Sequence, residues 1–152
     1  YSTDPDHVCT CAPAQIARYR SKLSGPLLDR IDLHVEVPAV PYEELRAGPG
    51  PLTSAVLRDH VTAARERQQH RYKNTPCRTN ADLNGALLER HCALESDGHT
   101  LMREAVRKLR LSARAYTRIL RLARTIADLE ETDRLAARHL HEAVALRTLD
   151  RE

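Results

Sequence analysis

The sequence is poor in aromatic residues: it contains no tryptophan, no phenylalanine and five tyrosines among 152 residues. Proteins that hold single-stranded nucleic acid stack successive bases on aromatic side chains, so this composition argues against such a platform. A chain of this length forms one domain that buries roughly 70 % of the surface exposed by the unfolded chain. Its core must be built mainly from Leu, Ala, Val and Ile, which suits packed helices.

Long apolar runs are also missing. No segment approaches the roughly 18 apolar residues needed to span a membrane, and no secretory signal is visible. The four cysteines are too few and too irregularly spaced for a disulfide framework: Cys9, Cys11, Cys77 and Cys92. We therefore expect reduced thiols, a cytoplasmic location and no membrane partner.

The sequence lacks the common motifs for nucleotide binding and hydrolysis. It has no G-x-x-x-x-G-K-[ST] segment, no Gly-Lys pair, no G-x-S-x-G, no H-E-x-x-H and no dinucleotide fingerprint. The chain therefore cannot cradle a triphosphate by itself, and we expect it to be inactive alone. Because it begins without methionine, inside what looks like a continuing motif, we expect it to be a piece of a longer protein.

The most informative stretch is SGPLLDRIDLHVEVP over residues 24–38. Ser-Gly-Pro opens a short helical turn, and apolar residues at every second position then predict a half-buried strand: Leu33, Val35 and Val37. Arg30 lies where the helix meets the strand, at the rim of the predicted sheet, where ligands and neighbouring subunits are met. Its guanidinium can donate paired hydrogen bonds to a phosphate or carboxylate. The alternative is a surface salt bridge to Asp29 or Asp32.

The segment before this stretch offers candidate metal ligands. His7, Cys9 and Cys11 alternate in a loop-like segment, so in an extended loop they would face one way. Three ligands do not complete a structural zinc site, and C-x-C is a poorer signal than C-x₂-C. Ordinary loop cysteines are the alternative. Pro13 fits the first position of a short amphipathic helix that follows.

Residues 38–51 form a connection rich in proline and glycine, with one short helical turn around 42–46, and we place a subdomain boundary in it. Beyond it the pattern is helical. A first helix, capped by Thr53 or Ser54, has a second half, 65–71, that is polar on all sides, so we expect this half to project into solvent or against a partner. Four further helices with short loops predict a bundle. They start near Leu83, at Ser96 or Asp97, at Ser112 and at Thr132.

Basic residues are concentrated in this bundle. Residues 101–125 contain eight basic residues against one acid, Glu104, a net charge of +7. Arg114, Arg118 and Arg121 follow at i, i+4 and i+7 and share a helix face, where like charges repel. A solvated face explains such spacing, but an anion would too: nucleotide phosphate, nucleic acid or an acidic neighbour. We take Arg118, Arg121 and Arg124 as candidate DNA- or anion-binding residues.

The stretch 24–38 and LSARAYTRILRLARTIADL over 111–129 together resemble the C-terminal part of the magnesium-chelatase-like AAA+ ATPases, in the competence-associated ComM/YifB family. Shorter similar segments run along nearly the whole chain: PAQIARYR at 13–20, ARERQ at 64–68, NADL at 80–83 and HCAL at 91–94. The resemblance implies a mainly α fold. Residues 1–38 would be the α/β remnant of the ATPase core, a helix plus one strand; 39–52 would be a linker and 53–152 the helical lid.

The same resemblance implies a function. Arg30 in LLDRID matches an arginine finger that reaches the γ-phosphate held by a neighbouring subunit, and Arg114 in LSARA matches a nucleotide-sensing arginine of the lid. For the intact protein it implies ATP and Mg²⁺, a homohexameric ring, and DNA remodelling such as branch migration; none of these ligands is expected on this chain alone. A Cys-Pro-Cys usual in the family just upstream would let Cys9 and Cys11 complete a zinc site.

Two other functions remain open at the level of sequence. One is a helical DNA-binding module without an ATPase role, which would use the net charge of +7 over 101–125. The other is a subunit of a true magnesium chelatase that acts on a porphyrin, although no recognisable tetrapyrrole contact occurs in the sequence.

Overall fold

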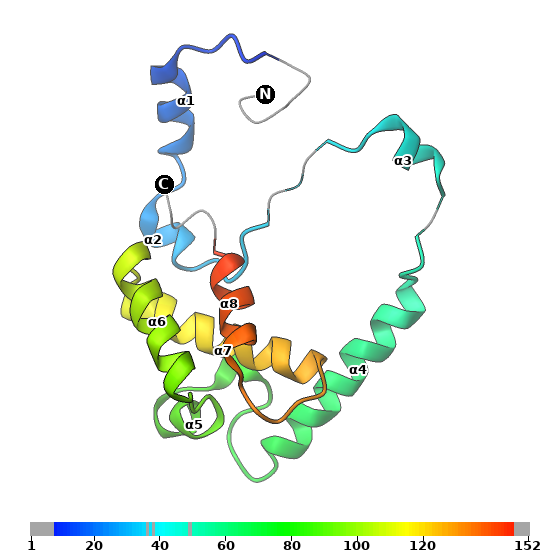
Figure 1. The fold of residues 1–152 in the computed structure, drawn as a ribbon, viewed down its shortest axis with the longest axis vertical. Helices are drawn as coiled ribbons and strands as arrows, with labels where there is room; N and C mark the ends of the chain where they lie inside the picture. The colour runs from blue at the N-terminus through cyan, green and yellow to red at the C-terminus, as the bar shows by residue number, and fades with distance from the viewer. Residues whose placement is uncertain (1–7, 36, 38, 49, 148–152) are drawn as a thin grey trace.

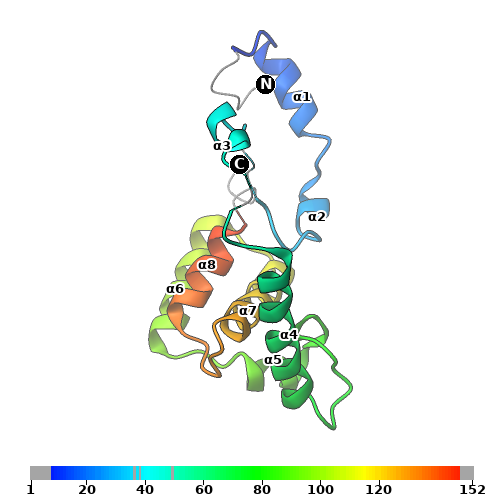
Figure 2. The same cartoon turned by 90° about the vertical axis from the view of Figure 1, so that its right-hand side faces the viewer.

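The computed structural model describes residues 8–35, 37, 39–48 and 50–147. In this part of the chain the elements are, in order, α1 (Pro13–Arg20), α2 (Gly25–Leu28), α3 (Tyr42–Arg46), α4 (Ser54–Arg71), the 3₁₀ turn η1 (Asn80–Asp82), α5 (Gly85–His91), α6 (Ser96–Leu109), α7 (Ala113–Leu129) and α8 (Ala137–Ala145). Helices α4 to α8 gather in one body, whereas α1 and α3 stand away from it (Figure 1 and Figure 2). The prediction of a mainly α fold is confirmed.

Helix α7 is the centre of this body. Its apolar residues recur at helical spacing, so one stripe is buried: Ala115, Ile119, Leu120, Ala123, Ile126 and Ala127. Helices α4, α5 and α8 pack against α7, and α6 packs against α8. The backbones of α6 and α8 approach closely at Gly98, where an added Cβ would lie 3.1 Å from Leu140 Cδ1. The predicted bundle is therefore formed, and α7 is its core helix.

Of the four predicted N-caps, two are confirmed and two are wrong. Thr53 caps α4, since its hydroxyl accepts from Val56 N–H, and Ser112 caps α7. Helix α6 begins one residue earlier than predicted, because Glu95 is its N-cap and Ser96 is already helical. Helix α8 begins at Ala137 rather than after Thr132. The carbonyls of residues 132 and 133 instead accept hydrogen bonds from α7.

The prediction that the polar second half of α4, 65–71, projects into solvent holds for only one side of it. Gln68 is buried, and Arg71 is ion-paired with Asp128 of α7. The exposed side consists of Arg65, Glu66, Gln69 and His70. Polarity on every side did not imply exposure on every side, because some of the polar groups bond to one another inside the body.

The predicted strand is not seen in the described part of residues 32–37; Glu36 and Pro38 lie outside that part. His34 forms a single parallel bridge with Arg147, and its N–H donates to the Leu146 carbonyl at 2.7 Å. The apolar side of the segment is uncovered, with Val35 67 % exposed. A strand needs a neighbouring strand along its whole length to satisfy its backbone groups. In the described part of the chain this segment is paired at one residue, His34.

None of the described helices is long and apolar enough to cross a membrane.

Candidate functional site

Arg30 lies in the turn of residues 29–32 that follows α2. Its side chain is exposed, and its guanidinium Nη1 donates to the Pro26 carbonyl at 2.9 Å. Within the described residues no carboxylate forms an ion pair with Arg30. The surface salt bridge to Asp29 or Asp32, which the sequence left open, is therefore not formed.

The two aspartates that flank Arg30 are engaged by α7. Asp29 accepts a hydrogen bond from Ser112 Oγ at 2.8 Å, and Asp32 forms an ion pair with Arg118. Arg118 also donates to the carbonyl of Arg30 itself at 2.6 Å. Both neighbouring negative charges are thus directed to α7, so no acid of the described part of the chain pairs with the guanidinium of Arg30.

The end of α8 holds the same turn from another direction. The side chain of Arg147 is fully buried, its Nη1 donates to the Ile31 carbonyl at 3.0 Å, and its Nη2 lies 3.9 Å from Asp29 Oδ1. We call this set the turn–lid contact, defined by Asp29, Asp32, Ser112, Arg118 and Arg147. It fixes the backbone around Arg30 against the helical body, so the position of Arg30 depends on the position of α7.

Arg114 lies at the second position of α7, directly beyond this contact. Its side chain is exposed, and Ser112 two residues before it is the N-cap of a 17-residue helix. The N-terminus of a helix carries a partial positive charge and favours anions. Arg30 and Arg114, distant in the sequence, are each within two residues of the Asp29–Ser112 hydrogen bond. The fold therefore places the backbone of the finger candidate and that of the sensor candidate on either side of one hydrogen bond.

These two side chains fit the chemistry of a phosphate group. Each guanidinium is a permanent cation with five N–H donors in a planar fork, which matches phosphate oxygens. Both are exposed, and the acids closest in sequence to Arg30 are already paired. Both side chains are therefore chemically suited to contact a phosphate group.

The other three predicted arginines bond within the chain. Arg118 binds the 29–32 turn, and Arg121 Nε donates to the Leu83 carbonyl at 2.8 Å. Arg124 is 2 % exposed and donates to the carbonyls of Thr132 and Asp133. The structure thus gives these side chains contacts that hold elements together, and their predicted binding of DNA or another anion stays a prediction.

Sequence reasoning missed a polar network between α4 and α7. Asp128 is fully buried; it forms ion pairs with Arg71 and, at 3.3 Å, with Arg124, and it accepts from Asn80 Nδ2 at 2.9 Å. Tyr72 OH donates to Asn80 Oδ1 at 2.6 Å. Burial lowers the pKa of Arg124. Burial also acts to lower the pKa of Arg71, but the hydrogen bonds to Asp128 and Tyr72 and the charge of Asp128 together outweigh it and raise that pKa. Local spacing could indicate only the i, i+4 pair of Arg124 and Asp128, because Arg71 and Asn80 lie 57 and 48 positions from Asp128.

The candidate metal ligands lie apart from this site. Cys11 is exposed and Cys9 partly so, and both are free thiols. A hydrogen bond from the backbone of Cys11 lowers the pKa of Cys9, whereas the hydrogen bond with Cys9 raises the pKa of Cys11. His7 lies outside the described residues. Within them no group of three His, Cys, Asp or Glu side chains is placed to hold a metal ion.

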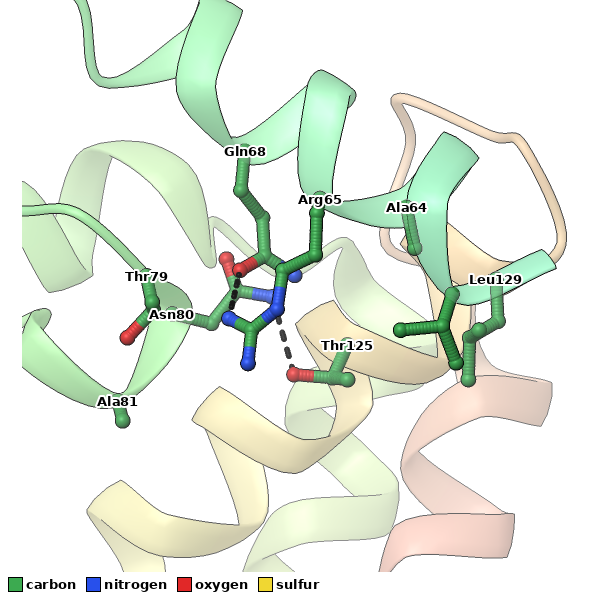
Figure 3. Close-up of a pocket in the computed structure, with 9 residues that line it drawn as sticks. Ala64, Arg65, Gln68, Thr79, Asn80, Ala81, Thr125 and Leu129 are labelled. Carbon is green, nitrogen blue, oxygen red and sulfur yellow. Dashed lines mark hydrogen bonds between the residues drawn. The ribbon is translucent and has the colours of Figure 1, made fainter. Parts of the chain in front are cut away.

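A hollow of about 270 Å³ opens between α4, η1 and α7. Figure 3 shows Arg65 and Gln68 of α4 on one side of it, joined by a 3.1 Å hydrogen bond, and Asn80 bonded to Thr125 of α7 on the other. Most of the remaining lining is aliphatic, as with Val61 and Leu129. No titratable pair in it suggests catalysis.

Comparison with protein families places the chain clearly. The model for the C-terminal region of magnesium chelatase subunit ChlI matches residues 51–147, and the model for magnesium chelatase subunit ChlI matches residues 1–45. The two matches together cover nearly the whole chain, and the first alone covers more than half of it.

Similarity to individual proteins supports the same family assignment. The chain is 42 % identical over 143 residues to the uncharacterized protein YifB of Salmonella typhimurium and 41 % identical over 143 residues to YifB of Escherichia coli, in each case over 93 % of this chain and 27 % of the relative. It is 43 % identical over 141 residues to the competence protein ComM of Haemophilus influenzae, over 92 % of this chain and 27 % of the relative. It therefore spans about a quarter of the length of these curated relatives. The chain belongs to the magnesium chelatase subunit ChlI family, as its C-terminal region, and is homologous to the YifB and ComM proteins.

Proposed function

We propose that this chain is the finger-and-lid part of a ring-forming AAA+ ATPase, in which Arg30 reaches the γ-phosphate of ATP held by the neighbouring subunit. One observation carries the proposal: the guanidinium of Arg30 is exposed while both flanking aspartates are bonded to α7. During phosphoryl transfer, charge spreads over the phosphoryl oxygens, and an arginine finger neutralises it. An arginine finger must not be ion-paired with acids of its own subunit, and its backbone must be held in place. The turn–lid contact supports both requirements, because it engages Asp29 and Asp32 and fixes the 29–32 turn.

Arg114 is the proposed second contact to the nucleotide. It is exposed at the start of α7, where the helix dipole and the first amide groups also favour a phosphate. Because the Asp29–Ser112 hydrogen bond links its helix to the 29–32 turn, movement of the lid would move Arg30 as well. We propose that ATP and Mg²⁺ are the cofactors of the intact protein, and that Mg²⁺ supplies neutralisation of the phosphate oxygens when bound.

The division of the chain follows from this proposal. Residues 1–38 would close the ATPase core, 39–52 would be the linker and 53–152 the lid. The family matches at 1–45 and 51–147 support a boundary in the proline- and glycine-rich stretch between them. The segments that cradle the triphosphate would lie in other parts of the intact protein, since the sequence of this chain contains no such motif.

We further propose a homohexameric ring that remodels DNA. The name of the Haemophilus relative, a competence protein, supports a link to DNA uptake. A contact in which one subunit reaches the nucleotide of the next is head-to-tail, and head-to-tail contacts that close generate rings.

The test is Arg30→Ala in the intact protein. We expect ATP turnover to fall by about 10³-fold or more, whereas binding of a non-hydrolysable ATP analogue changes by only a few fold. The matched control is Arg58→Ala, which removes an exposed arginine of α4 and should leave both quantities unchanged. Normal turnover in the Arg30 variant would show that Arg30 is not the finger.

A further inference from the structure

Three arginines along one edge of α6 make a basic surface that the proposed ATPase role does not use. Arg103 and Arg107 are one turn apart, and Arg110 follows at the C-cap of the helix. All three side chains are exposed. We call them the α6 basic edge. Helix α6 lies at the periphery of the helical body (Figure 1), so the edge is open to a large partner.

The charge of this edge is not neutralised by the chain. Within the described residues no carboxylate forms an ion pair with any of the three arginines, whereas Lys108 on the same helix is paired with Glu104 at 3.1 Å. Residues four apart, such as Arg103 and Arg107, lie within about 40° of each other around a helix axis, and Arg110 follows directly after the last helical residue, with a left-handed backbone. Like charges at this spacing repel, so the edge is a concentrated cationic surface.

The helix dipole does not account for the whole edge. Cations in the last turn of a helix are favourable, which explains Arg107 and Lys108 there. The effect is confined to about the last turn, and Arg103 lies before it. Positive charge thus extends along α6 further than stability of the helix requires.

The surroundings of the edge favour nucleic acid over an acidic protein. Protein interfaces have an apolar core, but most exposed residues that share this face of α6 are polar: Ser96, His99 and Thr100. Val106, 36 % exposed, is the one apolar side chain among them. Nucleic-acid interfaces are polar and strongly positive, and duplex DNA offers about one phosphate per 3.4 Å of each strand. Over the roughly 10 Å of helix axis between Arg103 and Arg110, each guanidinium can meet a phosphate.

We propose that the α6 basic edge binds the phosphate backbone of duplex DNA without reading its sequence. No Phe, Tyr or Trp side chain lies on this face of α6 to stack on a base, which agrees with a backbone contact. The proposal deepens the DNA part of the proposed function and rests on it, but it does not depend on the ATPase part. The α6 basic edge is also distinct from the three candidate residues on α7, whose guanidinium groups bond within the chain: Arg118, Arg121 and Arg124.

The test is binding of the chain to a fluorescent duplex of about 20 base pairs and mixed sequence, without nucleotide, from about 50 to 200 mM salt. The variant replaces Arg103, Arg107 and Arg110 with Gln. Its matched control replaces three other exposed cations that form no ion pair in the described part of the chain: Arg58, Lys73 and Arg90. Circular dichroism and thermal melting are used to check that each variant is folded.

We expect the edge variant to lose at least about tenfold in affinity at low salt, and its slope of log K against log salt to fall by about 2 to 3, since each lost phosphate contact contributes about 0.9. The control should change the slope by less than about 1. Equal losses in the two variants would overturn the α6 site while leaving DNA binding intact. No binding by the wild-type chain, or equally tight binding of polyglutamate, would overturn duplex DNA as the partner. None of these three results would bear on the ATP turnover of the Arg30 variant, so the two proposals can fail separately.

Discussion

The hydroxyl of Ser112 takes part in two hydrogen bonds. It accepts from the N–H of Ala115 at 3.1 Å, which caps α7, and it donates to Asp29 at 2.8 Å, which holds the 29–32 turn. A single oxygen thus connects the start of the central helix to the residue before Arg30. Loss of this oxygen should weaken the helix end and the turn–lid contact together.

Ser112→Ala should therefore cost more stability than loss of a cap alone. We expect about 1 kcal/mol for the cap and a further 0.5 to 1.5 kcal/mol, roughly, for the bond to Asp29. Thr53→Ala is the matched control, because Thr53 caps α4 and forms no tertiary hydrogen bond in the described part of the chain. Urea denaturation of both variants measures the difference. Equal losses of stability would mean that the Asp29 bond contributes nothing.

Single residues also show where sequence reasoning succeeds and where it stops. The caps Ser112 and Thr53 were predictable, because each precedes an apolar stripe at helical spacing. The partner of Arg118 was not predictable, because Asp32 lies 86 positions away. The partners of Arg124 are partly backbone carbonyls, which every residue has. Periodicity thus located the arginines on the helix but could not distinguish an arginine bonded within the chain from one exposed to solvent.

At the scale of elements, the buried carboxylate of Asp128 joins α4 to α7. It faces two buried or partly buried cations, Arg71 and Arg124, whose side chains are 13 % and 2 % exposed. Removal of one member of a buried ion pair leaves an uncompensated charge, which is far more costly than loss of an exposed pair. This explains why the polar half of α4 packs into the body.

Asp128→Ala should destabilise the chain by about 3 to 5 kcal/mol. The matched control is Arg67→Ala, which also removes an ion pair between α4 and the segment after α7, at 3.2 Å, but one whose aspartate, Asp133, is 91 % exposed. We expect less than about 1 kcal/mol for the control. The measurement is the free energy of unfolding in urea. An Asp128→Ala loss no larger than that of the control would contradict a stabilising role for the network.

The helices and the predicted strand differ in how far local sequence decides them. Helices α6 and α7 were predictable because their apolar stripes bury themselves against neighbours in the same body. The segment around His34 has the alternation of a strand, but a ladder requires a partner along its length, and within the described residues only Arg147 pairs with it. Alternation indicates what a segment can form, while the presence of neighbouring strands decides whether it does.

At the scale of the whole molecule, the structure consists of one helical body with the 29–32 turn fixed against it. Contacts from α7 and from Arg147 converge on this turn from segments more than 80 residues away in sequence. The roles of Arg30 and Arg114 are proposed from the sequence resemblance, and the fold adds that both residues lie within two positions of the same hydrogen bond. A finger and a lid residue joined in this way would respond to nucleotide together.

The central claim is that Arg30 acts on ATP held by a neighbouring subunit, and mixing of two inactive variants of the intact protein tests it most directly. One variant carries Arg30→Ala and the other a disabled phosphate-binding loop. In a mixed ring, an intact nucleotide site of the first variant can lie beside an intact Arg30 of the second. We predict that each variant alone is inactive and that the mixture regains ATP turnover. Mixed rings that form but remain inactive would contradict the account.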